Sequence, residues 1–248
     1  MEPEILAYIL SEWSNDKACS GILLCGSYAY GMPTEHSDID LRIVFDNTSG
    51  KTHRAGVTTF RKKTIAFRED TEYVFYQTMH LGIHQTNRFQ ARNFALGKIL
   101  YEKDQCLQYL KKEAHFLMKK KFPELNKDKI KYLLYKIWYD YDKIDCLPES
   151  DPFYVLNYYH ALEETLKNYS EIIRTEIISR HKLSAFLFST TFTDAYQITS
   201  FPDREFIELW TKAVNTINKT SYQELYAYII GNYPGIDVKN FRISMINN

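Results

Sequence analysis

Apolar and polar residues alternate with two different periods along this chain, and the change of period divides it into two regions. Before about residue 104, short apolar runs are separated by polar turns, as expected for strands. Later apolar residues recur at helical spacing, in segments near 105–121, 127–145, 153–180, 203–218 and 221–231. We expect an α+β fold: a mixed β-sheet flanked by helices over residues 1–104, and an all-helical domain over residues 105–248.

The first region begins with a helix near residues 4–13, followed by a short apolar run at 21–25 that is typical of a strand buried on both faces. That run ends abruptly at Gly26-Ser27. Residues 39–45 alternate: the apolar side chains share one face of the expected strand, and Asp38, Asp40 and Arg42 share the other. Further strands are expected at 57–67 and 72–76, a helix at 89–96 and a short apolar segment at 99–101.

Asp38 and Asp40 are the first candidates for chemistry. Two carboxylates at positions i and i+2 of a strand point to the same side and repel each other unless cations lie between them. Oxygen ligands without a neighbouring His or Cys suit Mg²⁺, which takes its remaining ligands from water and substrate phosphates. The Gly26-Ser27 turn allows a phosphate to approach the backbone closely. The pattern therefore predicts a triphosphate bound between this turn and a magnesium site.

The sequence Gly26-Ser27, a spacer and then Asp38-Ile39-Asp40 resembles the signature of the DNA polymerase β-like nucleotidyltransferase superfamily, of the small bacterial or antibiotic-modifying type. The resemblance implies that Ser27 contacts the β and γ phosphates of a nucleoside triphosphate, ATP by default, and that Asp38 and Asp40 hold two Mg²⁺ ions. It also implies transfer of a nucleoside monophosphate to an acceptor hydroxyl, with release of pyrophosphate. Residues 92–104 resemble the segment that closes such catalytic domains.

Relatives carry a third carboxylate on a later strand, and Glu72 resembles it in position; Asp70 is the alternative, because the register of that strand is not fixed by sequence. Tyr30 stands where many relatives have a basic residue that helps to hold the triphosphate. Arg42 or Lys98 are the expected substitutes, although Arg42 also suits a structural ion pair with Asp40. With Gly26 and Ser27, we count Arg42 and Ser37, the last residue of the polar loop, among the nucleotide-binding residues.

The amino-acid composition is that of an ordinary globular protein and does not indicate a particular function. Apolar residues make up 45% of the chain, and 31 basic residues balance 31 acidic ones, so net charge does not indicate a polyanion-binding protein. The four cysteines are far apart, without metal-ligand spacing, and are expected to be reduced. The chain has no long apolar span, and its first residues lack the pattern of a secretory leader. We expect a cytoplasmic protein with no membrane partner.

The acceptor is not fixed by the catalytic motif. The acidic cluster between Asp140 and Asp151 favours a small, cationic, hydroxylated molecule such as an aminoglycoside-like antibiotic, and Glu163 or Glu164 are candidates for an added catalytic carboxylate. The lysine-rich stretch from Lys111 to Lys136 and the twenty tyrosines support the alternative, an RNA 3′ end such as that of tRNA or a protein hydroxyl. A non-catalytic nucleotide-binding module is the further alternative.

Overall fold

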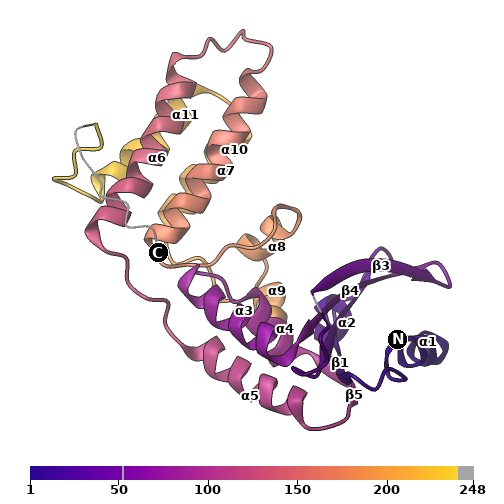
Figure 1. Ribbon diagram of the computed structural model, residues 1–248. Coiled ribbons are helices and arrows are strands. Elements are labelled where there is room, and N and C mark those ends of the chain that lie inside the picture. The colour runs from indigo at the N-terminus through magenta and orange to yellow at the C-terminus, as the bar shows by residue number, and fades with distance from the viewer. Residues whose placement is uncertain (52, 240–248) are drawn as a thin grey trace. The chain divides into compact units, whose positions relative to one another are not determined.

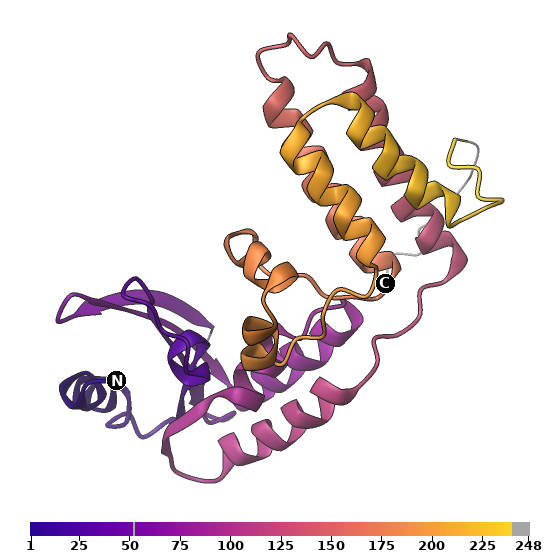
Figure 2. The same cartoon turned by 180° about the vertical axis from the view of Figure 1, so that it is seen from behind.

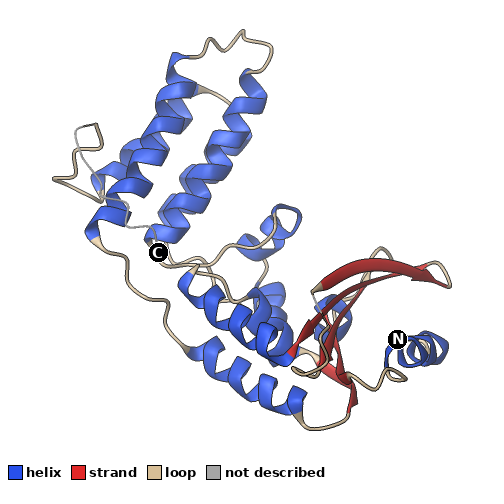
Figure 3. Ribbon diagram, viewed as in Figure 1, coloured by secondary structure: helices blue, strands red, loops and turns tan. Residues whose placement is uncertain are grey.

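The computed structural model describes residues 1–51 and 53–239, which form two compact units. The first unit comprises Met1–Phe122 together with Thr190–Ile198, and the second comprises Pro123–Ser189 together with the chain from Thr199 onward. All five strands of the described chain lie in the first unit, and the second is built from helices alone (Figure 3). The expected α+β class is confirmed. Within the described residues, no helix has both the length and the apolar character needed to cross a bilayer.

The first unit is built on a sheet with the strand order β3-β4-β2-β1-β5. Its strands are β1 (Cys19–Cys25), β2 (Ile39–Phe45), β3 (Arg54–Phe60), β4 (Lys63–Thr71) and β5 (Lys98–Glu102). The central pair, β1 and β2, is antiparallel, whereas β2 and β4 are parallel. All seven residues of β1 are buried, which confirms the strand expected from the apolar run that ends at Gly26.

Helices cover both faces of this sheet (Figure 1). One face packs against α1 (Pro3–Trp13) and the short α2 (Gly26–Tyr30) through Ile39, Leu41 and Ile43. The other face packs against α3 (Glu72–His84), α4 (Phe89–Leu96) and α5 (Cys106–Lys119) through Leu23, Cys25 and Val44. Alternate apolar residues from Ile39 to Phe45 share one face, as predicted, and Asp40 and Arg42 lie on the other face, which α3, α4 and α5 cover with a second core.

Two strand predictions are wrong. The strand expected over residues 57–67 is a hairpin, in which β3 and β4 are joined at Arg61 and Lys62, both with positive φ angles of 49° and 64°. The strand expected over residues 72–76 is the first part of α3, which begins after Thr71. The hydroxyl of Thr71 accepts a hydrogen bond from the amide of Val74, as an N-cap does. β4 extends past the expected end at residue 67 to Thr71, immediately before the position where the next strand was expected to begin.

The boundary of the first unit lies at Phe122 and not at residue 104. Leu107, Leu110, Ala114 and Leu117 give α5 an apolar face that is buried against β1 and α4, so this helix packs with the sheet. Residues 190–198, which include α9 (Thr190–Tyr196), also belong to the first unit although they are distant in sequence.

The second unit contains four long helices that lie alongside one another (Figure 2). They are α6 (Lys127–Cys146), α7 (Tyr154–Ile172), α10 (Arg204–Thr216) and α11 (Lys219–Gly231), with the short η1 (Arg180–Lys182) and α8 (Leu183–Phe188) between α7 and α10. Contacts link α6 to α7, α7 to α10, α10 to α11 and α11 to α6, so the four helices enclose one core. Buried tyrosines contribute to it: the hydroxyl groups of Tyr222 and Thr165 lie 2.8 Å apart.

Candidate functional site

The Gly26-Ser27 turn forms where β1 ends. Gly26 has a φ of +63°, a conformation that residues with a side chain rarely adopt. A Cβ atom at this position would lie 2.1 Å from Oδ2 of Asp40, which is closer than any non-bonded contact allows. Glycine is therefore required for two independent reasons, the backbone conformation and the space occupied by the Asp40 carboxylate. This contact brings the turn directly against the second aspartate of the motif.

Asp40 is opposite Cys25 in the register of β1 and β2, and Asp38 comes one residue before β2 begins. Because side chains alternate along a strand, Asp40 lies on the same side as Cys25, away from Ile39 and Leu41 in the core beneath. Asp38 is exposed and Asp40 is half-buried. The structure thus brings Gly26 and Asp40 together, with Ser27 next to the first in sequence and Asp38 two residues before the second.

Ser37 fixes the loop that leads to Asp38. Its hydroxyl accepts a hydrogen bond from the amide of Thr34 at 2.8 Å, and its own amide donates to the carbonyl oxygen of Thr34 at 3.1 Å. These two bonds close a tight turn immediately before the aspartates. Ser37 is accordingly placed to hold the loop in shape, and its hydroxyl is used within the loop.

Tyr30 occupies the position where relatives were expected to have a cation. Its hydroxyl donates a hydrogen bond to Oδ1 of Asn93 on α4 at 2.8 Å, and its ring contacts the ring of Tyr196 edge-on, with centroids 4.9 Å apart. Burial raises the pKa of Tyr30, so the hydroxyl is neutral at physiological pH. Tyr30 therefore anchors the end of α2 to α4 and α9. The sequence did not indicate either partner: Asn93 lies within the 92–104 segment without a predicted role, and Tyr196 belongs to no motif.

Arg42 extends toward α4. Its side chain is 7% exposed, Nη1 donates to the carbonyl oxygen of Leu41 at 2.9 Å, and the guanidinium lies 5.9 Å from the ring centre of Phe89. A weaker contact of 3.4 Å joins Nε to Oε1 of Gln90. The buried guanidinium is thus engaged by its own strand and by α4. Lys98, the other expected cation, is opposite Leu24 and so starts from the sheet face that does not carry Asp40.

The structure does not bring Glu72 to the aspartates. It follows Thr71, which pairs with Phe45 at the far end of β2, five residues beyond Asp40. At about 3.3 Å per residue, this separates Glu72 from Asp40 by roughly 16 Å along the sheet. Glu72 instead lines a surface cavity of about 600 Å³ together with Asp104 and Lys112. Burial and, secondarily, the charges of Asp104 and Asp46 raise the pKa of Glu72.

Asp70, the alternative third carboxylate, is also remote. It pairs with Val44 in the parallel register, four residues beyond Asp40, or about 13 Å along the strand. Its Oδ2 accepts a hydrogen bond from Nε of Arg68 at 2.7 Å and lies 2.9 Å from Nδ1 of His53. Glu69 points to the opposite face, where it accepts a hydrogen bond from the indole of Trp13. Asp70 and Glu69 are thus engaged by neighbouring side chains of the first unit.

The donor set at Asp38 and Asp40 fits a magnesium ion. Two carboxylates on one edge of a strand, with a glycine turn against them, offer the oxygen ligands that Mg²⁺ takes from proteins and leave room for phosphate oxygens. The contact between Gly26 and Asp40 places the predicted phosphate-binding turn beside one of the two predicted metal ligands. Neither Glu72 nor Asp70, the predicted third acids, lies beside Asp40.

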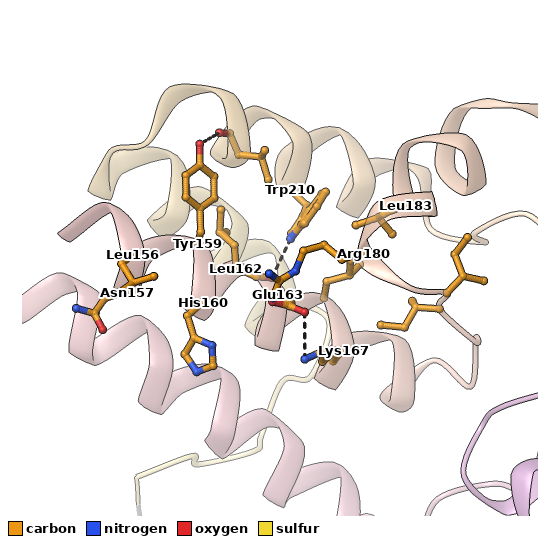
Figure 4. A pocket seen from close by; sticks show the side chains of 14 residues that line it. Leu156, Asn157, Tyr159, His160, Leu162, Glu163, Lys167, Arg180, Leu183 and Trp210 are labelled. Atoms are coloured by element: carbon orange, nitrogen blue, oxygen red, sulfur yellow. Dashed lines mark hydrogen bonds and ion pairs between the residues drawn. The ribbon is translucent and has the colours of Figure 1, made fainter. Parts of the chain in front are cut away.

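Two cavities are described in the second unit, and the larger one lies beside α7 (Figure 4). Its volume is about 640 Å³, and apolar side chains line most of it: Leu156, Leu162, Leu166, Ile177, Leu183, Trp210 and Val214. A charged group lies at one side, where Glu163 forms ion pairs with Arg180 and with Lys167, the latter at 3.3 Å. The indole of Trp210 donates to the carbonyl oxygen of Leu162, which fixes one wall.

A second cavity of about 320 Å³ lies between α6 and α7, lined by Tyr135, Lys136, Tyr139, Asp140, His160 and Glu164. Burial and, after it, the charge of Glu164 raise the pKa of Asp140 to about 6, while His160 and Lys136 act in the opposite direction. Nζ of Lys136 lies 4.0 Å from Glu164. The predicted acidic cluster therefore contributes Asp140 to a cavity whose charges are mixed.

The lysine-rich stretch is divided between the two units. In α5, Nζ of Lys111 donates to the carbonyl oxygens of Phe94, Ala95 and Gly97 at 3.0, 3.0 and 2.6 Å, and so caps the end of α4. In α6, Lys129 forms an ion pair with Glu171 at 3.0 Å. Several of these lysines thus have structural partners.

Comparison with known proteins agrees with this geometry. Residues 4–138, more than half of the chain, match the nucleotidyltransferase domain family. No curated protein matches the chain. Among solved structures, it is similar to a nucleotidyltransferase-like protein from Exiguobacterium sibiricum 255-15, with 15% identity and a TM-score of 0.41 over 92% of this chain and 75% of that one. On the family match, and with the Gly26-Ser27 turn set against Asp40, this chain belongs to the nucleotidyltransferase domain family.

Proposed function

We propose that this protein transfers a nucleoside monophosphate from a nucleoside triphosphate, ATP by default, to a hydroxyl group of a small molecule, in a Mg²⁺-dependent reaction. The observation that carries the proposal is the contact between Gly26 and the Asp40 carboxylate, which joins a phosphate-binding turn to a pair of metal-binding acids. Neither half of this arrangement would indicate the reaction alone.

The chain's residues would divide the work as follows. The backbone at Gly26 and the hydroxyl of Ser27 bind the β and γ phosphates, and Asp38 and Asp40 hold Mg²⁺. When bound, the ion neutralises charge on the triphosphate. The acceptor oxygen forms a bond to the α phosphorus, and the bond from that phosphorus to the bridging oxygen breaks. Pyrophosphate leaves with the electron pair, and the hydroxyl proton passes to solvent. The protein contributes positioning rather than covalent chemistry.

A small acceptor is favoured by the cavities of the helical unit. The larger one, at about 640 Å³, falls in the size range of small-molecule sites. Its lining is mostly apolar, with Glu163, Lys167 and Arg180 as a mixed-charge group. This lining favours an acceptor with an apolar body over a polycation. Transfer to an RNA 3′ end or to a protein hydroxyl is less favoured, because Lys111 and Lys129 have structural partners.

The test measures transfer from ATP, CTP, GTP and UTP labelled at the α phosphate. Acceptors are an aminoglycoside panel, a panel of hydroxylated apolar molecules, total tRNA and the protein itself, each with pyrophosphate detection. Label in a small molecule supports the proposal, and label in RNA alone contradicts the acceptor class. Nucleotide binding without pyrophosphate release from any mixture indicates the non-catalytic module instead.

The matched variants are Asp40→Asn and Glu72→Gln. Each removes one carboxylate charge from the first unit, but only Asp40 lies against the Gly26 turn. We expect Asp40→Asn to reduce turnover by at least about 100-fold and Glu72→Gln to leave it within about twofold, because a misplaced reacting group alone can cost two orders of magnitude. Equal losses in the two variants would contradict the proposed site.

A further inference from the structure

The residues that pair with Asp40 on the two neighbouring strands carry no further carboxylate. Asp40 pairs with Cys25 of β1 on one side and with Ala66 of β4 on the other. Cys25 is fully buried, and its thiol is directed to the carbonyl oxygens of Leu23 and Asn93, at 3.8 and 3.6 Å. Ala66 offers only a methyl group. The two positions that pair with Asp40 across the sheet therefore carry no carboxylate.

The next row of the sheet is basic. Arg42 and Arg68 pair across β2 and β4, two residues beyond Asp40 and Ala66 on the same face. Arg68 donates to Asp70 and lies 5.4 Å from the ring centre of Phe75. Two guanidinium groups thus separate Asp40 from Asp70. A cation at Asp40 cannot share a carboxylate from farther along β4.

The described part of the chain also lacks a cluster of metal-binding side chains at any other place. Across residues 1–51 and 53–239, the structure contains no group of three or more His, Cys, Asp and Glu side chains arranged to hold a metal ion. α4, which covers this end of the sheet face, has the sequence FQARNFAL and carries no acid. Asp38 and Asp40 are consequently the carboxylates that β2, its two neighbouring strands and α4 offer at this end of the sheet.

We propose that this protein provides ligands for one divalent cation, the one that accompanies the nucleoside triphosphate, and lacks the carboxylate that would hold a second cation at the acceptor hydroxyl. The missing carboxylate corresponds to Ala66. This inference rests on the proposed function, since it concerns the same Asp38 and Asp40 site. Two carboxylates carry the charge that one divalent cation neutralises, and Mg²⁺ completes its shell with phosphate oxygens and water.

The geometry also identifies the change that would create a second site. Adjacent strands lie about 4.8 Å apart, so an aspartate in place of Ala66 would set its carboxylate beside that of Asp40, close enough to share a cation. Val57 pairs with Ala66 from β3, on the far side of β4 from β2. An aspartate there adds the same charge in the same row but one strand farther from Asp40. Val57 is 67% exposed and tolerates a polar residue.

The experiment counts Mn²⁺ ions bound per chain, by electron paramagnetic resonance and calorimetry, in the presence of a saturating nucleoside triphosphate analogue with a methylene group between the α and β phosphorus atoms. We expect one ion per chain in the wild type and in Val57→Asp, and two in Ala66→Asp. The affinity of Ala66→Asp for the second ion should exceed that of Val57→Asp by at least about tenfold, because carboxylate number sets affinity at such sites.

The outcomes separate this inference from the function on which it rests. Two ions in the wild type would overturn the one-cation site and leave nucleotidyl transfer intact. Failure of the wild type to bind the analogue with Mn²⁺ would overturn both. A single ion in a folded Ala66→Asp variant, judged by circular dichroism, would overturn the assignment of the gap to Ala66. Should Ala66→Asp not fold, the wild-type count alone decides the question.

Discussion

Substitution of Gly26 by alanine tests the central contact of the site. Two costs follow from the structure. The φ of +63° is disfavoured for alanine by roughly 1–2 kcal/mol. The added Cβ would also lie 2.1 Å from Oδ2 of Asp40, so the carboxylate must move. We expect Gly26→Ala to lose stability and, separately, to weaken Mn²⁺ and nucleotide binding.

Gly31→Ala is the matched control. Gly31 ends α2 with a φ of +79°, and a Cβ there would meet no atom within 4 Å. This variant incurs the same backbone cost without displacing Asp40. Gly31→Ala should lower the midpoint of thermal unfolding by roughly 2–8 °C, given about 2–4 °C per kcal/mol for a chain of this size, and Gly26→Ala should lower it by at least as much.

Activity and binding should then distinguish the two variants. Displacement of a reacting group by about 1 Å can cost 100-fold in rate, so Gly26→Ala should turn over about 100-fold more slowly than Gly31→Ala. Calorimetry with Mn²⁺ and the methylene analogue should show the same order of affinities. If Gly26→Ala binds and reacts as well as Gly31→Ala, the Asp40 carboxylate does not act where the structure places it, and the reasoning is refuted.

Three further substitutions, one of them with a control variant, test the supporting structure. Tyr30→Phe removes the 2.8 Å hydrogen bond to Asn93 and should cost about 1 kcal/mol in urea unfolding, while a variant as stable as the wild type would show that the bond contributes nothing. Lys111→Met removes the cap on α4 and should cost about 1–3 kcal/mol in the same assay, whereas Lys112→Met, at an exposed position, should change stability by less than about 0.5 kcal/mol. Burial raises the pKa of the Asp140 carboxyl from 3.8 to about 6. The folded state therefore binds the Asp140 proton more tightly than the unfolded chain does, and the stability that this protonation contributes is lost as pH rises from about 4 to 6. Asp140→Asn should therefore unfold at a higher temperature than the wild type at pH 8 and at the same temperature at pH 4, and equal melting at both values would contradict the pKa shift.

The alternation of residues 39–45 predicted the placement of Asp38 and Asp40 because the period of two decides the face of every residue at once. Ile39, Leu41 and Ile43 lie in one core, and Asp40 lies on the opposite face, as expected. The family was likewise evident from this short segment, since its glycine, serine and two aspartates at fixed spacing resemble the signature of the family that residues 4–138 match. These features are local, and local sequence can specify them.

The prediction that Glu72 begins a strand was wrong for a different reason. Residues 72–76 alternate as a strand does, but Thr71 caps a helix at this point, and the hairpin at Arg61 and Lys62 shifts β4 toward the N-terminus. That turn contains neither glycine nor asparagine, so its positive φ angles leave no sequence signal. The position of a third acid depends on pairing between β2 and β4, which are distant in sequence.

Tertiary packing also decided the extent of the first unit. The helical spacing of residues 106–119 predicted a helix correctly, but not that its apolar face packs on β1. The association of Thr190–Ile198 with the first unit, where Tyr196 contacts Tyr30, has no local signal at all. Periodicity identifies elements and their buried faces; it does not identify which element covers which.

The most direct test of nucleotidyl transfer at Asp38 and Asp40 compares α-labelled with γ-labelled nucleoside triphosphate in the acceptor assay, using the wild type and Asp40→Asn. We predict that the wild type transfers the α label and releases the γ label as pyrophosphate, and that Asp40→Asn transfers neither. Transfer of the γ label to the acceptor, or undiminished transfer of the α label by Asp40→Asn, would contradict the account.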